Sequence, residues 1–444
     1  MRVKIDFKSI NKLAIPATFA GIAEPVLSLT DTAIVGNIPQ DGLESLAAAG
    51  IVGSFLSMLI WILGQTRSAI SAIVSQYYGA GQLEEVKTLP ARAIALNLLL
   101  SVLILVSTVF FVEDIFRFLN ASGKILRYCV TYYAIRVWGF PLTLFVFAVM
   151  GIFRGLQNTF WPMVIALTGA SLNIVLDIVL VYGIEGILEP MHLEGAAWAS
   201  LMAQGVMALM AMVLLIRKTD IRLRIRFPFH TELGRLIGMS LNLFVRTLAL
   251  NTALILAVRE AAALGDASIG AHTIAVNLWL FSAFFIDGYA AAGNSLAGRL
   301  LGARDYEGLW RLARKVVQYG LVVCLTLVLF SIIFYRPIGR LFSSDDSVLQ
   351  LFYAIFFIII LGLPINAVAF VLDGVFKGLG EMKFLRNVLL LATFFGFVPS
   401  LYLGISWGWG LYGIWSAFTI WMLIRGGALV WKFRRKFRPL LGKG

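Results

Sequence analysis

Residues 171–181, SLNIVLDIVLV, form an apolar run interrupted only by Asn173 and Asp177, with Ser171 at its edge. The amide and the carboxylate are four residues apart, so on a helix they lie on one face, one turn from each other. A charged Asp near the centre of a membrane-spanning helix costs roughly 2.5–3.5 kcal/mol on insertion scales. Because ionisable groups inside spans mark ion and substrate pathways, this run indicates a functional carboxylate inside a bilayer.

The composition of the whole chain supports a membrane location. Of the 444 residues, 60% are hydrophobic and 14% are charged, and the mean hydropathy is +0.88. A soluble domain of this length would need more charge on its surface. Twelve apolar segments are long enough to cross the hydrocarbon core: 13–36, 49–76, 91–112, 128–152, 161–183, 195–216, 236–258, 269–297, 316–335, 349–373, 387–406 and 411–431. We therefore predict an all-α integral membrane protein with twelve transmembrane helices.

The net charge of +13 follows the predicted topology. When successive loops are assigned to alternate sides, 27 Lys and Arg residues lie on the side of both termini and 6 on the opposite side. This asymmetry satisfies the positive-inside rule, so both termini are predicted to be cytoplasmic and no nucleic-acid partner is expected. The predicted location is the inner (plasma) membrane of a bacterial or archaeal cell.

A shift of 223 residues aligns the two halves of the chain. It superimposes, without a gap, Gly79–Ala80 on Gly302–Ala303, Gly139 and Pro141 on Gly362 and Pro364, and Gly155 on Gly378. Six spans in each half give both halves the same orientation, as in parallel repeats with a binding space between them. We predict two pseudo-symmetric six-helix bundles, residues 1–222 and 223–444, with a cytoplasmic linker over 217–235.

The intramembrane carboxylates of the first half have no counterparts in the second half. In the alignment given by the same 223-residue shift, Asp31 corresponds to Leu254 and Asp177 corresponds to Ser400. A carboxylate needed only for folding would be expected in both copies. The sequence therefore predicts an ion site in the first half alone.

Six motifs, in order along the chain, resemble those of the MATE multidrug antiporters, and most closely the DinF-like branch. They are AIPATFAGIAEPVLSLTDTAIVGN (14–37), FRGLQNTFWP (153–162), SLNIVLDIVLVYG (171–183), GAAWAS (195–200), DGYAAAGNSLAGRLLGA (287–303) and LDGVFKGLGEMKFLRN (372–387). The resemblance covers essentially the whole chain. It implies two six-helix bundles arranged as a V, which export organic cations in exchange for H⁺ or Na⁺.

The resemblance also implies where the ion site lies. In the DinF-like branch the amino-terminal bundle carries it, which points to Asp31, to Asn173 and Asp177, and to Ser200, where the family usually has Thr. If the two carboxylates share a cavity, they can take up a proton. Together with an amide and a hydroxyl oxygen they can instead form an all-oxygen cage for a hard cation. A third reading is a structural ion pair with a buried Arg.

This sequence departs from the family pattern at two further positions. Asn37 replaces a His, and Asn294 stands where a Glu is common in the eighth span. The second change argues against a carboxylate role for that span.

Other intramembrane polar residues are candidates for a substrate cavity. Glu24 lies seven residues before Asp31, on nearly the same helix face, and is expected to line the cavity and attract cationic substrate. Gln65 and Gln204 either face the cavity or hydrogen-bond to neighbouring helices.

The second half contributes two membrane carboxylates, Asp287 and Asp373. Either one binds substrate or pairs with Arg246 or Arg136 to keep the local charge neutral, and the sequence leaves both roles open.

These observations predict a secondary active antiporter, not an enzyme. The chain has three His residues and none of the motifs HExxH, CxxC, GxSxG or Walker-type GxxxxGK[ST]. Because the sequence has no Walker motif, transport is expected to be powered by an ion gradient and not by ATP. No cofactor is expected, and the coupling ion is H⁺ or Na⁺. The expected partners are lipophilic or cationic organic compounds and the bilayer, and the expected state is a monomer. The alternative function is a lipid-linked saccharide flippase, which would need a larger cationic cavity for pyrophosphate.

Overall fold

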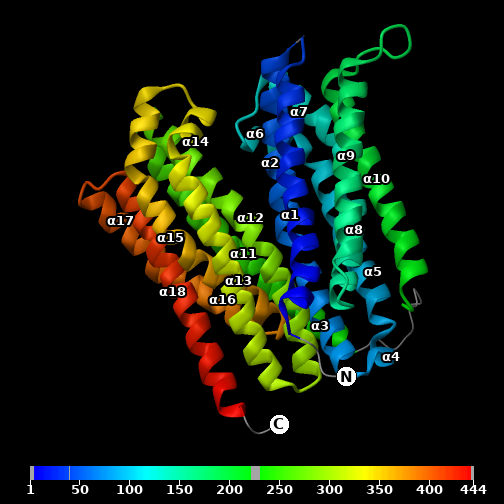
Figure 1. Cartoon of the computed structure of the whole chain (residues 1–444). Coiled ribbons are helices and arrows are strands. Elements are labelled where there is room, and N and C mark those ends of the chain that lie inside the picture. The colour runs from blue at the N-terminus through cyan, green and yellow to red at the C-terminus, as the bar shows by residue number, and fades with distance from the viewer. Residues whose placement is uncertain (1–4, 40, 222–230, 442–444) are drawn as a thin grey trace. The chain divides into compact units, whose positions relative to one another are not determined.

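A computed structural model describes residues 5–39, 41–221 and 231–441, and these residues are almost entirely helical (Figure 1). The helices are α1 (Phe7–Gly36), α2 (Gly42–Leu63), α3 (Thr66–Ala80), α4 (Leu83–Val86), α5 (Leu89–Phe110), α6 (Val112–Phe118), α7 (Gly123–Arg136), α8 (Gly139–Gly155), α9 (Phe160–Tyr182), α10 (His192–Lys218), α11 (Thr231–Ala263), α12 (Asp266–Gly302), α13 (Tyr306–Ile333), α14 (Tyr335–Phe342), α15 (Asp346–Gly378), α16 (Met382–Leu391), α17 (Val398–Ser406) and α18 (Leu411–Phe437). A π-helical turn joins α16 to α17, and an isolated β-bridge links Ile184 to Leu188.

Eleven helical segments in the described residues are long and apolar enough to cross a membrane. The remaining predicted span, 128–152, corresponds to α7 and α8, which meet the same criterion together but are bent by 47° at their junction. Pro141 lies in the first turn of α8, where its missing N–H and fixed φ favour the start of a new helix. The predicted all-α membrane class is therefore confirmed, and twelve spans are found when this bent pair counts as one.

The chain divides into two compact units by its contacts. The amino-terminal unit comprises Phe19–Val74 and Gln82–Ile237. The carboxy-terminal unit comprises Gly238 onward together with the described residues up to Thr18 and Ser75–Gly81. The predicted division between residues 222 and 223 stays a prediction, and residues 222–230 of the predicted linker lie outside the described residues.

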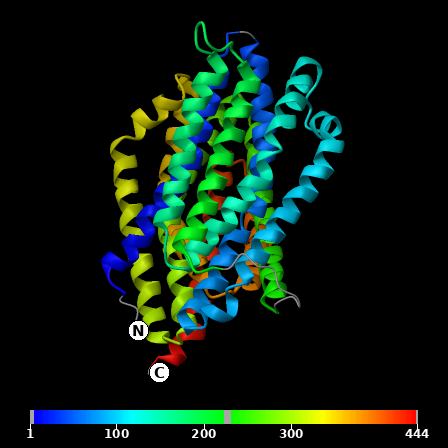
Figure 2. The ribbon, with the colours of Figure 1, turned by 90° about the vertical axis from the view of Figure 1, so that its right-hand side faces the viewer.

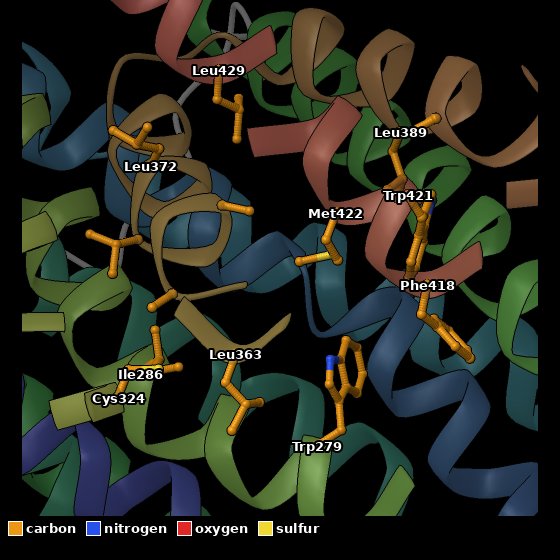
Figure 3. Packing of buried hydrophobic residues seen from close by; sticks show 14 of the residues in the cluster. Trp279, Ile286, Cys324, Leu363, Leu372, Leu389, Phe418, Trp421, Met422 and Leu429 are labelled. Atoms are coloured by element: carbon orange, nitrogen blue, oxygen red, sulfur yellow. The ribbon is translucent and has the colours of Figure 1, made fainter. Parts of the chain in front are cut away.

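In the carboxy-terminal unit, α12 and α15 pack against each other at the centre, and α18 packs beside α15. Figure 3 shows Trp279 of α12, Leu363 of α15, and Phe418 and Met422 of α18 in this hydrophobic core. The first turns of α1 belong to the same unit, where Tyr289 of α12 donates a 2.8 Å hydrogen bond from its hydroxyl to the Asn11 side-chain oxygen.

Glycines on α15 allow α12 to approach closely. A Cβ atom at Gly374 would lie 2.1 Å from the carbonyl oxygen of Ala290, and one at Gly378 would lie 2.1 Å from that of Asn294. The two glycines are four residues apart, the small-xxx-small spacing that brings membrane helices into backbone contact. The predicted repeat position Gly378 thus has a packing role in this half.

Replacing Gly374 with Ala is expected to destabilise the carboxy-terminal unit by about 1–3 kcal/mol, because the added methyl group meets rigid backbone. Gly427→Ala in α18 is the matched control, since a Cβ there meets nothing within 4 Å. Thermal unfolding in detergent measures both variants. Equal melting temperatures for the two would show that α12 and α15 can separate without cost.

In the amino-terminal unit, α9 and α10 pack against each other over much of their length. Gly195 of α10 allows this contact, because a Cβ there would lie 2.5 Å from the carbonyl oxygen of Leu180 in α9. A second cluster joins α2, α6 and α7, where the rings of Phe116 and Tyr133 lie 5.5 Å apart in edge-to-face contact. Figure 2 shows α5, α6 and α7, in blue to cyan, along one edge of this unit.

Candidate ion-coupling site

Helix α9 has one buried stripe, formed by Pro162, Ile165, Gly169, Asn173, Asp177 and Val181. These positions recur every three or four residues, the period of one helix face. Asn173 and Asp177, which would be costly to expose to lipid, therefore point into the amino-terminal unit. Asp177 is fully buried and Asn173 is 2% exposed.

Asp31 of α1 meets this stripe through Asn173. The Asn173 amide nitrogen donates a 2.5 Å hydrogen bond to Oδ2 of Asp177 and a 3.4 Å hydrogen bond to Oδ1 of Asp31. The two carboxyl groups are also within hydrogen-bonding reach of each other. The structure thus brings together three of the four side chains that the sequence placed at an ion site.

Ser200, the fourth residue, is buried on α10 but forms no hydrogen bond in the described part of the chain. The second carboxylate oxygen of Asp177, Oδ1, likewise has no hydrogen-bond partner among the described residues. Buried polar atoms are rarely left unsatisfied, so a carboxylate oxygen without a partner is suited to hold a proton or a cation. Within the described ranges no group of three or more His, Cys, Asp and Glu side chains could hold a metal ion.

An arginine that the sequence did not assign to this site lies beside it. The guanidinium of Arg136, at the end of α7, interacts electrostatically with both Asp31 and Asp177. It lies 5.7 Å from the centre of the Tyr132 ring, and over the described residues it makes no ion pair within 4.0 Å. Its place among the few Lys and Arg residues inside the predicted spans was the available sequence signal.

A cavity of about 260 Å³ adjoins this site within the amino-terminal unit. Helices α1, α2, α3, α7, α8, α9 and α10 contribute to its mostly apolar wall. Its polar and charged lining residues include Glu24, Asp31, Arg67, Tyr132, Arg136, Asn173 and Gln204.

The structure separates the two predicted glutamines. Gln204 lines the cavity beside Gly139, where a Cβ atom would lie 1.7 Å from the Gln204 Oε1 atom. Gln65 lies outside the cavity wall and donates a 3.4 Å hydrogen bond to the carbonyl oxygen of Trp61 in the preceding turn. The glycine at 139 thus makes room for one polar lining residue.

Glu24 lines the cavity, as expected from its spacing to Asp31, but it does not stand alone. It interacts electrostatically with Arg67, and the Trp61 side chain lies close to its carboxylate. The Arg67 guanidinium is held over the ring of Phe147, 5.0 Å from its centre. Two acids and two arginines therefore line the cavity, so its charge is balanced when every group is ionised.

A family model described as MatE matches residues 16–179 and 243–402, most of the chain. The chain belongs to the MATE family. Among its relatives, the DNA damage-inducible protein F of Escherichia coli K12 is 28% identical, with 97% of this chain and 93% of that protein aligned. The multidrug resistance protein NorM of Vibrio cholerae is 23% identical, with 97% and 96% aligned.

A solved structure titled "Crystal structure of MATE in the bent conformation" has the same fold. Its TM-score is 0.89 at 23% identity, over 98% of this chain and 96% of that chain. The predicted resemblance to the MATE family and its DinF-like branch is confirmed. The chain is accordingly a multi-pass membrane protein and a secondary transporter, not an enzyme.

In this MATE chain the carboxy-terminal unit holds a separate charge cluster around Asp373 of α15. Its carboxylate accepts hydrogen bonds from Arg246 at 2.7 Å and from Arg425 at 3.1 Å, and it forms an ion pair with Lys377 at 3.2 Å. Asp287 is exposed and interacts with Lys377 and Arg425 only electrostatically. Of the two roles open for Asp373, the geometry supports charge neutralisation by Arg246.

Proposed function

We propose that the protein is a secondary active antiporter that exports lipophilic, cationic organic compounds in exchange for H⁺ or Na⁺. The coupling site is Asp31 and Asp177 with Asn173 between them, and Ser200 supports it from α10. The substrate lies in the cavity of the amino-terminal unit. Counting Asp177 behind the cavity wall, three carboxylates (with Glu24 and Asp31) outnumber the two guanidinium groups there and attract its positive charge.

One observation carries this proposal, namely the hydrogen bonds of Asn173 to two carboxylates on different helices. Asp31 lines the cavity, whereas Asp177 lies behind it in the protein interior. Ion binding at the pair would change the charge of the cavity wall without requiring a contact between ion and substrate. That arrangement suits alternating occupancy by substrate and ion.

The exchange follows from the charges of the site. With the ion absent, the carboxylates offset the charges of Arg136 and of a cationic substrate. When H⁺ or Na⁺ loads from outside, it neutralises part of that charge, weakens substrate attraction and repacks α1 against α9. Substrate then leaves, and return to the inward-open state releases the ion to the cytoplasm.

The orientation of Asn173 favours the proton among the two ions. Its amide presents the nitrogen to both carboxylates, and an amide nitrogen donates hydrogen bonds and does not ligate a cation. A sodium ion bound by all three side chains would require the amide to rotate by half a turn. A proton shared by two carboxyl groups requires no such rotation.

Proteoliposomes loaded with a fluorescent organic cation test the coupling ion. We expect efflux under an imposed pH gradient without Na⁺, and little efflux under a Na⁺ gradient at equal pH on both sides. The reverse result would assign the site to Na⁺. Efflux at the same rate with and without either gradient would overturn the antiporter proposal itself.

The flippase alternative finds no support in the cavity. A pyrophosphate group requires a strongly cationic lining, whereas Arg67 and Arg136 here are balanced by Glu24 and Asp31. We also propose that both termini face the cytoplasm of a bacterial or archaeal cell, on the ground of the 27-to-6 distribution of Lys and Arg.

A further inference from the structure

A groove runs between α13 and α18 at one end of the carboxy-terminal unit, and α15 forms its floor. Its volume is about 460 Å³. We propose that this groove binds an anionic phospholipid, with the headgroup phosphate among its arginines and the beginning of an acyl chain on its apolar floor.

The groove carries positive charge without a protein counter-charge. Arg314 of α13 and Arg434 and Arg438 at the end of α18 line it, and no acidic residue does. Within residues 5–39, 41–221 and 231–441, none of the three forms an ion pair with an Asp or Glu. Lys436, in contrast, is paired with Glu381. Guanidinium groups bind phosphate oxygens in a bidentate manner, so unpaired arginines converging on one groove suit a phosphate.

The rest of the groove is apolar and can contact a hydrocarbon chain. Val317, Val368, Leu372 and Val430 form its apolar surface. At its edge, the rings of Trp310 and Phe433 stack 5.6 Å apart, which joins α13 to α18. Tryptophan is enriched at the level of lipid headgroups, and basic pockets between spans bind anionic headgroups.

Trp431 strengthens the case for a lipid as the occupant. It is 56% exposed on the adjoining face of α18, and the Arg435 guanidinium lies 5.1 Å from the centre of its ring. Figure 1 shows the carboxy-terminal end of α18 in red. A soluble phosphate would use the arginines but not the apolar floor. The positive-inside rule explains basic residues at helix ends, but not their convergence from two helices on one groove.

Native mass spectrometry of the full-length protein released from nanodiscs tests this site. The discs contain phosphatidylglycerol and phosphatidylcholine with identical acyl chains in equal amounts. We expect the protein to retain about one phosphatidylglycerol in preference to phosphatidylcholine. In the double variant Arg314→Gln/Arg434→Gln, this preference should fall by about fivefold for each arginine. The control Arg304→Gln/Arg311→Gln removes the same charge from exposed positions outside the groove and should match the unaltered protein.

A second variant distinguishes a loss of lipid binding from a folding defect of the arginine variant. Val317→Trp fills the groove and leaves all its arginines in place, so it should also lower phosphatidylglycerol retention while efflux is unchanged. Equal retention of both lipids by the unaltered protein, or equal loss in the control variant, would overturn the proposal. Displacement of the lipid by millimolar inorganic phosphate would assign the groove to soluble phosphate instead.

Discussion

Replacing Asp177 with Asn is expected to reduce ion-coupled efflux to the level of vesicles without the protein. The amide has nearly the same shape and can still accept the hydrogen bond from Asn173, so the fold should survive. It cannot ionise, however, and therefore can neither release a proton nor offset a sodium charge. Efflux of a fluorescent organic cation from everted vesicles under an imposed gradient measures the loss.

The matched control is Asp114→Asn, which removes an exposed carboxylate from α6 of the same unit and should leave efflux unchanged. Asp31→Asn should be as defective as Asp177→Asn. The double variant should be no worse than either single variant, because two groups that share one ion act as a unit. Coupled efflux that persists in Asp177→Asn would show that this carboxylate is not the coupling group, although membership of the MATE family would stand.

Replacing Asp373 with Asn is expected to destabilise the carboxy-terminal unit by about 3–5 kcal/mol, the range for breaking a buried ion pair. The substitution leaves Arg246, Lys377 and Arg425 around a neutral side chain, with both guanidinium groups buried. An uncompensated charge away from water carries a large desolvation cost. The melting temperature in detergent and the amount of folded protein in the membrane should both fall.

Asp287→Asn is the matched control for this cluster. It removes the same charge from an exposed position that forms no ion pair within the described residues, so only a small part of the effect is expected. Adding Arg246→Gln to Asp373→Asn should restore part of the lost stability, because it removes one of the unpaired cations. If Asp373→Asn is stable but no longer transports, Asp373 binds substrate, and charge neutralisation is not its main role.

Much of the ion site could be predicted from the chain alone. A helix face follows from spacing, so Asn173 and Asp177 had to point the same way once α9 formed. The high cost of a carboxylate in hydrocarbon indicated that this face points inward. The motif resemblance then added Asp31, which lies on the distant helix α1.

The neighbours of the site could not be predicted in this way. Arg67 and Arg136 belong to helices whose rotation about their own axes depends on packing, and nothing in their local sequence states which acids they approach. The same holds for Gln65 and Gln204, which look alike in sequence but differ in their access to the cavity.

By itself, the sequence determined the membrane class, the twelve apolar segments, the family and the polar face of α9, because hydropathy and helical period act within a single segment. Only the tertiary structure decided that Asn173 bridges Asp31 and Asp177, that Arg136 lies beside them, and that Asp373 is enclosed by three cations. It also decided that the predicted span 128–152 is bent between α7 and α8. Contacts between helices depend on how each helix is rotated and on where small residues such as Gly374 permit close approach, and those quantities are set by packing of the whole chain.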